Sequence, residues 1–270
     1  MKQIGIIGCG NMGSAIVNQL ARDLRYKVTV YDKNDEAAAK VSSSENVSSA
    51  SLQQLLQSSA TVILAVKPQI LPQLYPTLRT YPDINWLSIA AGVDLDTLEH
   101  SLNSKKVVRL MPNMAASVGK SVTALSVHPT CPKSLVQEAV EISGAFGTVH
   151  KIDESLISAF IGISGSGIAT CFSFFHNMAM GAVHSGLDYQ TALSLICETS
   201  ASAAHLVQST KEHPQSLLTK VCSPGGTTIE AMKTLSDGKF SSSVISSVVS
   251  ASEKAKYMEQ QAKVNKEGDK

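Results

Sequence analysis

The chain has 270 residues, enough for one large domain or two of ordinary size. Its hydrophobic content of 43% supports a folded core. A formal net charge of +1 and an aromatic content of 5% argue against nucleic acid as a partner, because such surfaces need clustered cations and stacking rings.

Strand-like and helix-like patterns alternate through residue 150. Short apolar, β-branched runs predict strands at 3–8, 27–32, 60–66, 85–91, 106–111 and 121–127. Helical patterns cover 11–24, 51–58 and 69–80. Strands that are apolar almost throughout predict a parallel sheet covered by helices on both faces. The fold class expected for residues 1–152 is therefore α/β, a Rossmann-type doubly wound sheet domain.

The pattern becomes helical after residue 152. Helices are expected at 153–186, 188–209, 215–221, 227–236 and 240–262, with Asp188 as the N-cap of the second. Phe240, Val244 and Val248 form an apolar stripe on the last helix, and small residues over 162–182 allow close helix approach. We expect residues 153–270 to form an all-helical domain that makes at least a homodimer. The alternative is a helical cap that closes on its own chain.

Cysteine usage and hydropathy bear on the compartment. The five cysteines form no CxxC pair and no short-spaced framework, which is typical of a reducing cytoplasm. The opening apolar run is too short for a signal peptide, and the apolar stretch 168–183 is shorter than a membrane span. Seven histidines show no HxxxH or HxH spacing, so no metal site is expected. The sequence predicts a cytoplasmic protein that has no membrane partner.

A glycine-rich loop follows the first predicted strand and opens the first helix. "GCGNMG" places Gly8, Gly10 and Gly13 in GxGxxG spacing, with Cys9, Asn11 and Met12 between them. The glycines serve a tight turn, the approach of a pyrophosphate and close helix packing, and the helix N-terminus favours the anion. The loop predicts a dinucleotide site.

The end of the second predicted strand bears on the choice of dinucleotide. Asp32 lies 19 residues after Gly13, where a carboxylate binds the ribose 2′-hydroxyl group of NAD. Lys33 beside it offers a point charge for the 2′-phosphate of NADP. The sequence therefore predicts NADPH or NADH and does not choose between them. Later strand ends add cofactor candidates: Ala65, Val66, Lys67, Pro68, Ala90, Ala91 and Gly92.

A second glycine-rich stretch, "CSPGGTTIEAM" (222–232), runs into a helical pattern late in the chain. Thr227 and Glu230 have the spacing of a capping box, and Gly238 is expected to stop the helix. Gly225 and Gly226 remove side chains before the helix, so backbone N–H groups of Gly226, Thr227 and Thr228 are expected to be open to an anion. The alternative is a Pro-Gly turn with an ordinary cap.

Several segments resemble the pyrroline-5-carboxylate reductase family, whose members catalyse the last step of proline synthesis. They are "CSPGGTTIEAM", "RLMPNMAASVGKSVTAL" (109–125), "ISGSGIATCFSFFHNMAMGAVHSGL" (163–187), "GCGNMG" and "LAVKP". The likeness covers roughly residues 3–260. It implies a Rossmann domain followed by a helical dimerisation domain, NAD(P)H as the cofactor, and homodimers that assemble to decamers.

The resemblance also implies roles for single residues. Thr228 corresponds to a catalytic threonine whose hydroxyl group binds the ring nitrogen of the substrate. Ser223, Gly225, Gly226 and Thr227 bind the substrate carboxylate, and Glu154 aligns with an acidic residue near the substrate; a helix-start glutamate that favours the dipole is the other reading of Glu154. Asn113 is expected near the cofactor. The chain departs from the family at Asn113-Met114-Ala115, often Asn-Thr-Pro, and at "GSGIAT" (165–170), often "GSGPAY".

Two other functions compete with this interpretation. A β-hydroxyacid dehydrogenase also joins such a loop to a helical domain, but it needs a lysine that residues 155–187 lack. A non-catalytic NAD(P)H-binding protein would keep the first loop and would not need the second.

Overall fold

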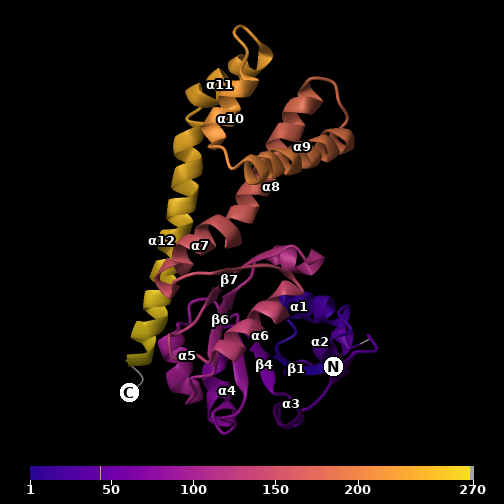
Figure 1. Ribbon diagram of the computed structural model, residues 1–270, viewed down its shortest axis with the longest axis vertical. Coiled ribbons are helices and arrows are strands. Elements are labelled where there is room, and N and C mark those ends of the chain that lie inside the picture. Colours follow the sequence, from indigo (N-terminus) through magenta and orange to yellow (C-terminus); the bar gives the residue numbers. More distant parts are fainter. Residues whose placement is uncertain (43, 268–270) are drawn as a thin grey trace. The chain divides into compact units, whose positions relative to one another are not determined.

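The computed structural model describes residues 1–42 and 44–267, with side chains to residue 261. These residues form two compact units. One contains Met1–Gly165 and the chain from Ala251 onward, and the other contains Ser166–Ser250 (Figure 1). The domain boundary at residue 152 stays a prediction, since residues 153–165 are grouped here with the first unit.

An eight-stranded sheet forms the centre of the first unit, in the order β3-β2-β1-β4-β5-β6-β7-β8. Its strands are β1 (Lys2–Ile7), β2 (Tyr26–Tyr31), β3 (Val47–Ser49), β4 (Thr61–Leu64), β5 (Asn85–Ser88), β6 (Val107–Met111), β7 (Ser121–Ser126) and β8 (Gly147–Lys151). β1 to β6 are parallel, as the apolar strands predict.

The last two strands correct the prediction of a wholly parallel sheet. β7 is antiparallel to β6, and β8 is parallel to β7. Only residues 112–120 separate β6 from β7, and they contain the short 3-10 turn η1 (Met114–Val118). A parallel connection needs a crossover of about a dozen residues or more, so this short link forces the strand to reverse.

Helices cover both faces of the sheet, as predicted. They are α1 (Asn11–Ala21), α2 (Asp35–Val41), α3 (Leu52–Ser58), α4 (Leu71–Leu78), α5 (Leu95–Leu102) and α6 (Lys133–Gly144). Side chains of α1, α2 and α6 share one buried cluster with the sheet, and those of α3, α4 and α5 share another.

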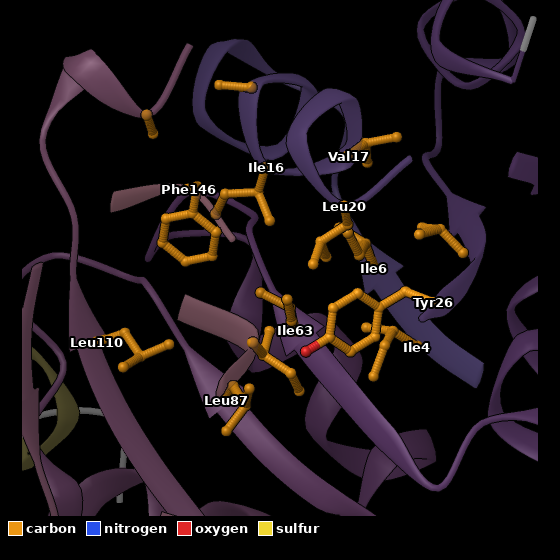
Figure 2. Close-up of a cluster of buried hydrophobic side chains, with 14 of the residues drawn as sticks. Ile4, Ile6, Ile16, Val17, Leu20, Tyr26, Ile63, Leu87, Leu110 and Phe146 are labelled. Atoms are coloured by element: carbon orange, nitrogen blue, oxygen red, sulfur yellow. The ribbon is translucent and has the colours of Figure 1, made fainter. Parts of the chain in front are cut away.

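Strand alternation divides the side chains between the two clusters. Ile6 belongs to the cluster with α1, whereas its neighbour Ile7 belongs to the cluster with α3. Figure 2 shows Ile16 and Leu20 of α1 beside Ile6 and Ile63 of the central strands. Because all four are fully buried, this packing fixes α1 on one face of the sheet and the loop before it at the carboxyl end of β1.

The second unit is helical, as expected. It contains α8 (Gly167–His184), α9 (Tyr189–Thr210), α10 (Pro214–Val221), α11 (Thr227–Asp237) and the start of α12 (Phe240–Glu267). The predicted N-cap is confirmed, since the Asp188 side chain accepts from the Thr191 N–H group at 3.0 Å. Gly238 follows the end of α11, also as predicted. The described core of this unit is small and centres on Ala179, Ala192 and Ile196.

The helical segment that leads into the second unit is longer than its apolar stretch suggests. It runs through η2 (Glu154–Leu156), α7 (Ile157–Phe160), the π-helical turn η3 (Ile161–Gly165) and α8. The stretch 168–183 is by itself too short for a membrane span, but Glu154–His184 spans 31 residues and contains an 18-residue window whose mean hydropathy is 1.6. Length and composition alone would therefore let this segment cross a membrane, a test that buried core helices of other proteins also pass. The expectation of no membrane partner stays a prediction.

Candidate active site

The first glycine-rich loop joins β1 to α1 and has the backbone that the spacing predicts. Gly8 has φ +107°, a conformation that side chains rarely adopt. A Cβ atom on Gly13 would lie 2.0 Å from the Gly8 carbonyl oxygen, so only glycine lets α1 begin this close to the strand. The turn is therefore fixed by backbone contacts within the loop itself.

The start of α1 is open to a ligand. Gly10 is the N-cap and provides no side-chain cap, and a Cβ atom built on it would meet nothing within 4 Å. The N–H groups of Asn11, Met12 and Gly13 occupy the first turn, where no intrahelical carbonyl is available. Open space above unpaired amides at a helix N-terminus fits a dinucleotide pyrophosphate.

Asp32 follows β2 and binds the backbone of this loop. One carboxylate oxygen accepts from the Cys9 N–H group at 2.6 Å, and the other accepts from the Asn34 N–H group at 2.9 Å. The Cys9 thiol is buried beneath the loop, where desolvation, with a smaller contribution from Asp32, raises its pKa to about 11. This thiol is therefore neutral near pH 7 and serves as a packing group.

A hollow of about 320 Å³ lies beside the loop, at the carboxyl ends of β1, β2 and β4. Several predicted cofactor residues line it: Gly8, Gly10, Asp32, Lys33, Ala65, Val66 and Lys67. Five further residues line the hollow and were not predicted: Ile7, Tyr31, Ile70, Gln73 and Leu74. Their only sequence signal is position, because they flank predicted residues at strand ends or on the next helix.

The other predicted cofactor residues lie outside this hollow. Ala90 is buried just after β5, and Gly92 next to it has φ +76° with open space around it. Ala91 is exposed and Pro68 is half-buried. Strand ends of a doubly wound sheet are where ligands bind, so a cofactor role for these residues stays a prediction.

Asn113 is committed to local structure. Its side-chain oxygen accepts from the Ala115 N–H group at 3.2 Å, which caps η1, and its amide group donates to the Ser164 hydroxyl at 3.2 Å. Asn113 and Ser164 are both buried. Asn113 thus holds η1 and the π-helical turn η3 together, and its expected contact with the cofactor stays a prediction.

The second glycine-rich loop begins with a tight turn. The Gly226 N–H group donates to the Ser223 carbonyl oxygen at 3.0 Å, with Pro224 and Gly225 at the two central positions. Gly225 has φ +68°. Proline followed by a glycine of positive φ is the signature of a type II turn.

This turn corrects two details of the sequence interpretation. The N-cap of α11 is Gly226, and it provides no side-chain cap, so Thr227 and Glu230 form no capping box. The Gly226 N–H group is used inside the turn and is not open to an anion. Both differences arise because the Pro-Gly turn leads the chain into the helix one residue earlier than the threonine pattern suggests.

The remaining groups of this loop still suit a small acid. The N–H groups of Thr227, Thr228 and Ile229 occupy the uncapped first turn of α11. Ser223 and Thr227 are exposed, and Thr228 is half-buried. In the described part of the chain, the Thr228 hydroxyl makes no hydrogen bond. The turn therefore presents free amides and hydroxyl groups that can bind a carboxylate and one further polar atom.

Glu154 lies in the first unit and has partners there. Its Oε1 atom accepts from the Arg109 guanidinium at 2.7 Å and from the Leu95 N–H group at 2.8 Å. Arg109 is 1% exposed and also binds Glu259 at 2.8 Å. A contact between Glu154 and the substrate stays a prediction. Arg109 was not predicted, because nothing in a strand pattern indicates a buried cation whose partner lies 150 residues away.

Comparisons with known proteins agree with these features. The family model for pyrroline-5-carboxylate reductase dimerisation matches residues 154–258, and that for NADP oxidoreductase, coenzyme F420-dependent, matches residues 3–92. The pyrroline-5-carboxylate reductase of Aquifex aeolicus is 34% identical, over 95% of this chain and 97% of its own. That of Methanosarcina acetivorans is 35% identical, over 95% of this chain and 98% of its own.

A solved structure extends the likeness to the fold. The pyrroline-5-carboxylate reductase of Coxiella burnetii is 29% identical and superimposes with a TM-score of 0.84, over 94% of this chain and 97% of its own. The relatives thus match along both glycine-rich loops and both units. The chain belongs to the pyrroline-5-carboxylate reductase family.

Proposed function

We propose that the chain reduces the cyclic imine 1-pyrroline-5-carboxylate to L-proline with NAD(P)H, the last step of proline biosynthesis. The observation that carries the proposal is the match to curated pyrroline-5-carboxylate reductases over 95% of the chain. The Gly8–Gly13 loop, open at Gly10, suits the dinucleotide. The dinucleotide supplies the hydride, and the protein supplies binding and orientation.

The substrate site is proposed to lie at the turn Ser223–Gly226 and the first turn of α11. The substrate carboxylate would bind the N–H groups of Thr227 and Thr228 and the Ser223 hydroxyl, with Gly225 and Gly226 keeping side chains away. Hydrogen bonds to a charged group contribute about 1.5–3 kcal/mol each, so two or three hold a small carboxylate without an arginine.

Thr228 is proposed to assist the chemistry through its hydroxyl group. The ring nitrogen of the substrate is protonated when the reaction ends, and a protonated imine is the better electrophile. A neutral hydroxyl that binds this nitrogen orients the ring, and no strong general base is needed. The absence of a hydrogen bond to the Thr228 hydroxyl within the described residues leaves that group available for the role.

A substitution at Thr228 tests the assignment. Thr228→Ala should lower kcat by about 10- to 100-fold, the loss expected for one hydrogen bond to a charged group, while dinucleotide affinity stays unchanged. Turnover is followed as the loss of NADH or NADPH absorbance with pyrroline-5-carboxylate, and affinity by calorimetry. Thr234→Ala is the matched control, because the Thr234 hydroxyl bonds only the Glu230 carbonyl oxygen of its own helix. Parent-like turnover of Thr228→Ala would remove Thr228 from the mechanism.

Gly226→Val tests the carboxylate site separately. A Cβ atom at Gly226 would lie 3.2 Å from the Ser223 carbonyl oxygen, and a larger side chain would shield the first amides of α11. Proline, the product, should bind this variant at least about tenfold more weakly. If proline binds it as it binds the parent, the carboxylate lies elsewhere. A parent protein that binds dinucleotide and reduces no imine would favour the non-catalytic alternative.

The second unit is proposed to form the dimer that the matched dimerisation family implies. It exposes large apolar side chains, including Phe172, Met180, Leu195 and Leu206. An apolar groove of about 650 Å³ lies within it, between α8, α11 and α12. Exposed apolar surface on this scale marks an interaction site, which also accounts for the apolar character of Glu154–His184.

A higher assembly and a compartment complete the proposal. We propose that five dimers form a decamer, which sedimentation would detect as ten copies of the 28.6 kDa chain. All five cysteines are free, which suits the reducing cytoplasm proposed as the location. If the protein sediments as a dimer over a wide concentration range, the proposed decamer is wrong.

A further inference from the structure

We propose that this chain binds NADH in preference to NADPH, and that Asp32 makes the choice. Its carboxylate would accept a hydrogen bond from the 2′-hydroxyl group of the adenosine ribose and repel a phosphate at the same position. The inference rests on the dinucleotide use proposed above. The sequence alone leaves the choice open, because Asp32 and Lys33 argue in opposite directions.

The position of the Asp32 carboxylate is fixed. Each of its oxygens accepts a backbone N–H group, from Cys9 at 2.6 Å and from Asn34 at 2.9 Å. The Cys9 amide belongs to the glycine-rich loop, and the Asn34 amide belongs to the N-cap of α2. The carboxylate is therefore held by two separate segments of the chain. The side chain therefore cannot swing away from a second negative charge without releasing both amides.

The carboxylate also faces the right place. Asp32 lines the hollow beside Gly8 and Gly10, at the end of β2, where the adenosine ribose lies in doubly wound folds. A carboxylate has about four lone-pair positions, and the two backbone amides use two of them. Asp32 can thus hold the loop and still accept from a ribose hydroxyl group.

The charge of Asp32 acts on a neighbouring side chain of the loop, the Cys9 thiol. It is one of the two causes that raise the pKa of the Cys9 thiol, after desolvation. Because Cys9 stays neutral, it neither adds to nor cancels the negative charge of Asp32. An approaching 2′-phosphate would therefore meet that charge at close range.

The cations that line the hollow do not offset the repulsion between Asp32 and a 2′-phosphate. None of the twelve residues that line the hollow is an arginine, the side chain that binds phosphate with two parallel hydrogen bonds. Lys33 and Lys67 line it but are exposed. Attraction from solvated lysines is weak and screened by salt, whereas the carboxylate is half-buried and held in place. We therefore assign the choice to Asp32.

Calorimetric titration of the full-length protein with NADH and NADPH, without substrate, tests the proposal. NADH should bind with a Kd at least about tenfold lower, the ratio expected from one charge-assisted hydrogen bond. Asp32→Asn keeps one accepting oxygen and loses the charge, so it should reduce the Kd ratio by about tenfold, mainly through tighter NADPH binding. Circular dichroism reports whether the variant folds, and Asp32→Ser is the second variant if it does not.

Two further variants separate the causes. Asp35→Asn removes the same charge three residues away, on exposed helix surface, and should leave the Kd ratio unchanged. Lys33→Ala should change the ratio less than twofold. The proposal would be overturned if the parent bound NADPH more tightly than NADH and Lys33→Ala lost that preference. It would also be overturned if a folded Asp32→Asn variant kept the Kd ratio of the parent.

Turnover with pyrroline-5-carboxylate distinguishes this inference from the proposed function. NADH preference without imine reduction would support the role of Asp32 and contradict the proposed reaction. Imine reduction with NADPH as the tighter cofactor would support the reaction and overturn the role of Asp32.

Discussion

The two glycine-rich loops of this protein precede helices in the same way and are built in opposite ways. In the first, Gly8 and Gly13 are buried, and Asp32 binds the loop backbone at 2.6 Å. In the second, Ser223, Pro224 and Gly225 are exposed, and a Cβ atom built on Gly225 would meet nothing within 4 Å. Both leave the first amides of a helix uncapped by side chains.

The contrast separates two ways of holding an anion site. The shape of the first loop is determined by its own chain, because strand, helix and Asp32 contact it directly. The shape of the second loop depends on the internal geometry of one Pro-Gly turn. The unit that contains this loop has only a small described core and matches a dimerisation family. Substitutions in the first loop should therefore affect folding, and those in the second mainly ligand binding.

The largest expected effect is at Gly13. Gly13→Ala places a Cβ atom 2.0 Å from the Gly8 carbonyl oxygen, so the loop must shift. We expect a loss of about 3 kcal/mol in the free energy of unfolding, by urea titration, as for overpacked cores. Gly10→Ala is the control, since its space is open, and should cost less than about 1 kcal/mol as an N-cap change. Equal stability of the two variants would contradict the claim that close packing at Gly13 fixes the first loop.

The next effect concerns the Cys9 thiol. Burial and Asp32 raise its pKa from 9.0 to about 11, so at pH 8 it should react with a thiol reagent about 100-fold more slowly than in the unfolded chain. Mass spectrometry of timed alkylation measures the rate.

The same shift predicts a pH dependence of stability. The folded state favours the neutral Cys9 thiol, so this stabilisation is complete below pH 9 and is lost as the pH rises toward 11. Cys9→Ala should remove that part of the decline. An identical alkaline decline in parent and variant would contradict the raised pKa.

A smaller effect tests whether Glu154 contacts the substrate or only stabilises the first unit through Arg109. Glu154→Gln weakens the contact with buried Arg109 and should cost about 2 kcal/mol in the free energy of unfolding, with KM unchanged. Glu259→Gln is the matched control, because it binds the same guanidinium. A raised KM in Glu154→Gln alone would place that carboxylate at the substrate.

The smallest effect is at Gly225. Gly225→Ala must adopt φ +68° with a side chain, which costs about 1 kcal/mol, and it meets no steric obstacle. We expect a small shift of the thermal midpoint and a measurable loss of proline affinity. A loss of stability as large as that of Gly13→Ala would show that the second loop is also held by packing.

Local patterns predicted most of the elements and missed the weakest. The short strand β3 and helices α2, α5 and α6 were not indicated, because three to twelve residues with mixed polarity give little periodicity. Predicted strands at 60–66 and 85–91 extend past β4 and β5, since their last residues leave the sheet for the ligand edge. The reversal of β7 depends on the length of a connection and not on the composition of a strand.

Local signals in the chain account for the α/β-then-helical order, the two glycine-rich loops and the family, because periodicity, turn chemistry and motif spacing are local properties. Three further features become visible only in the folded chain: Asp32 holds the Cys9 amide, Gly226 replaces Thr227 as the cap of α11, and Arg109 pairs with Glu154 and Glu259. These contacts join residues far apart in the chain or depend on where a turn places one amide, so they are determined by packing and backbone geometry.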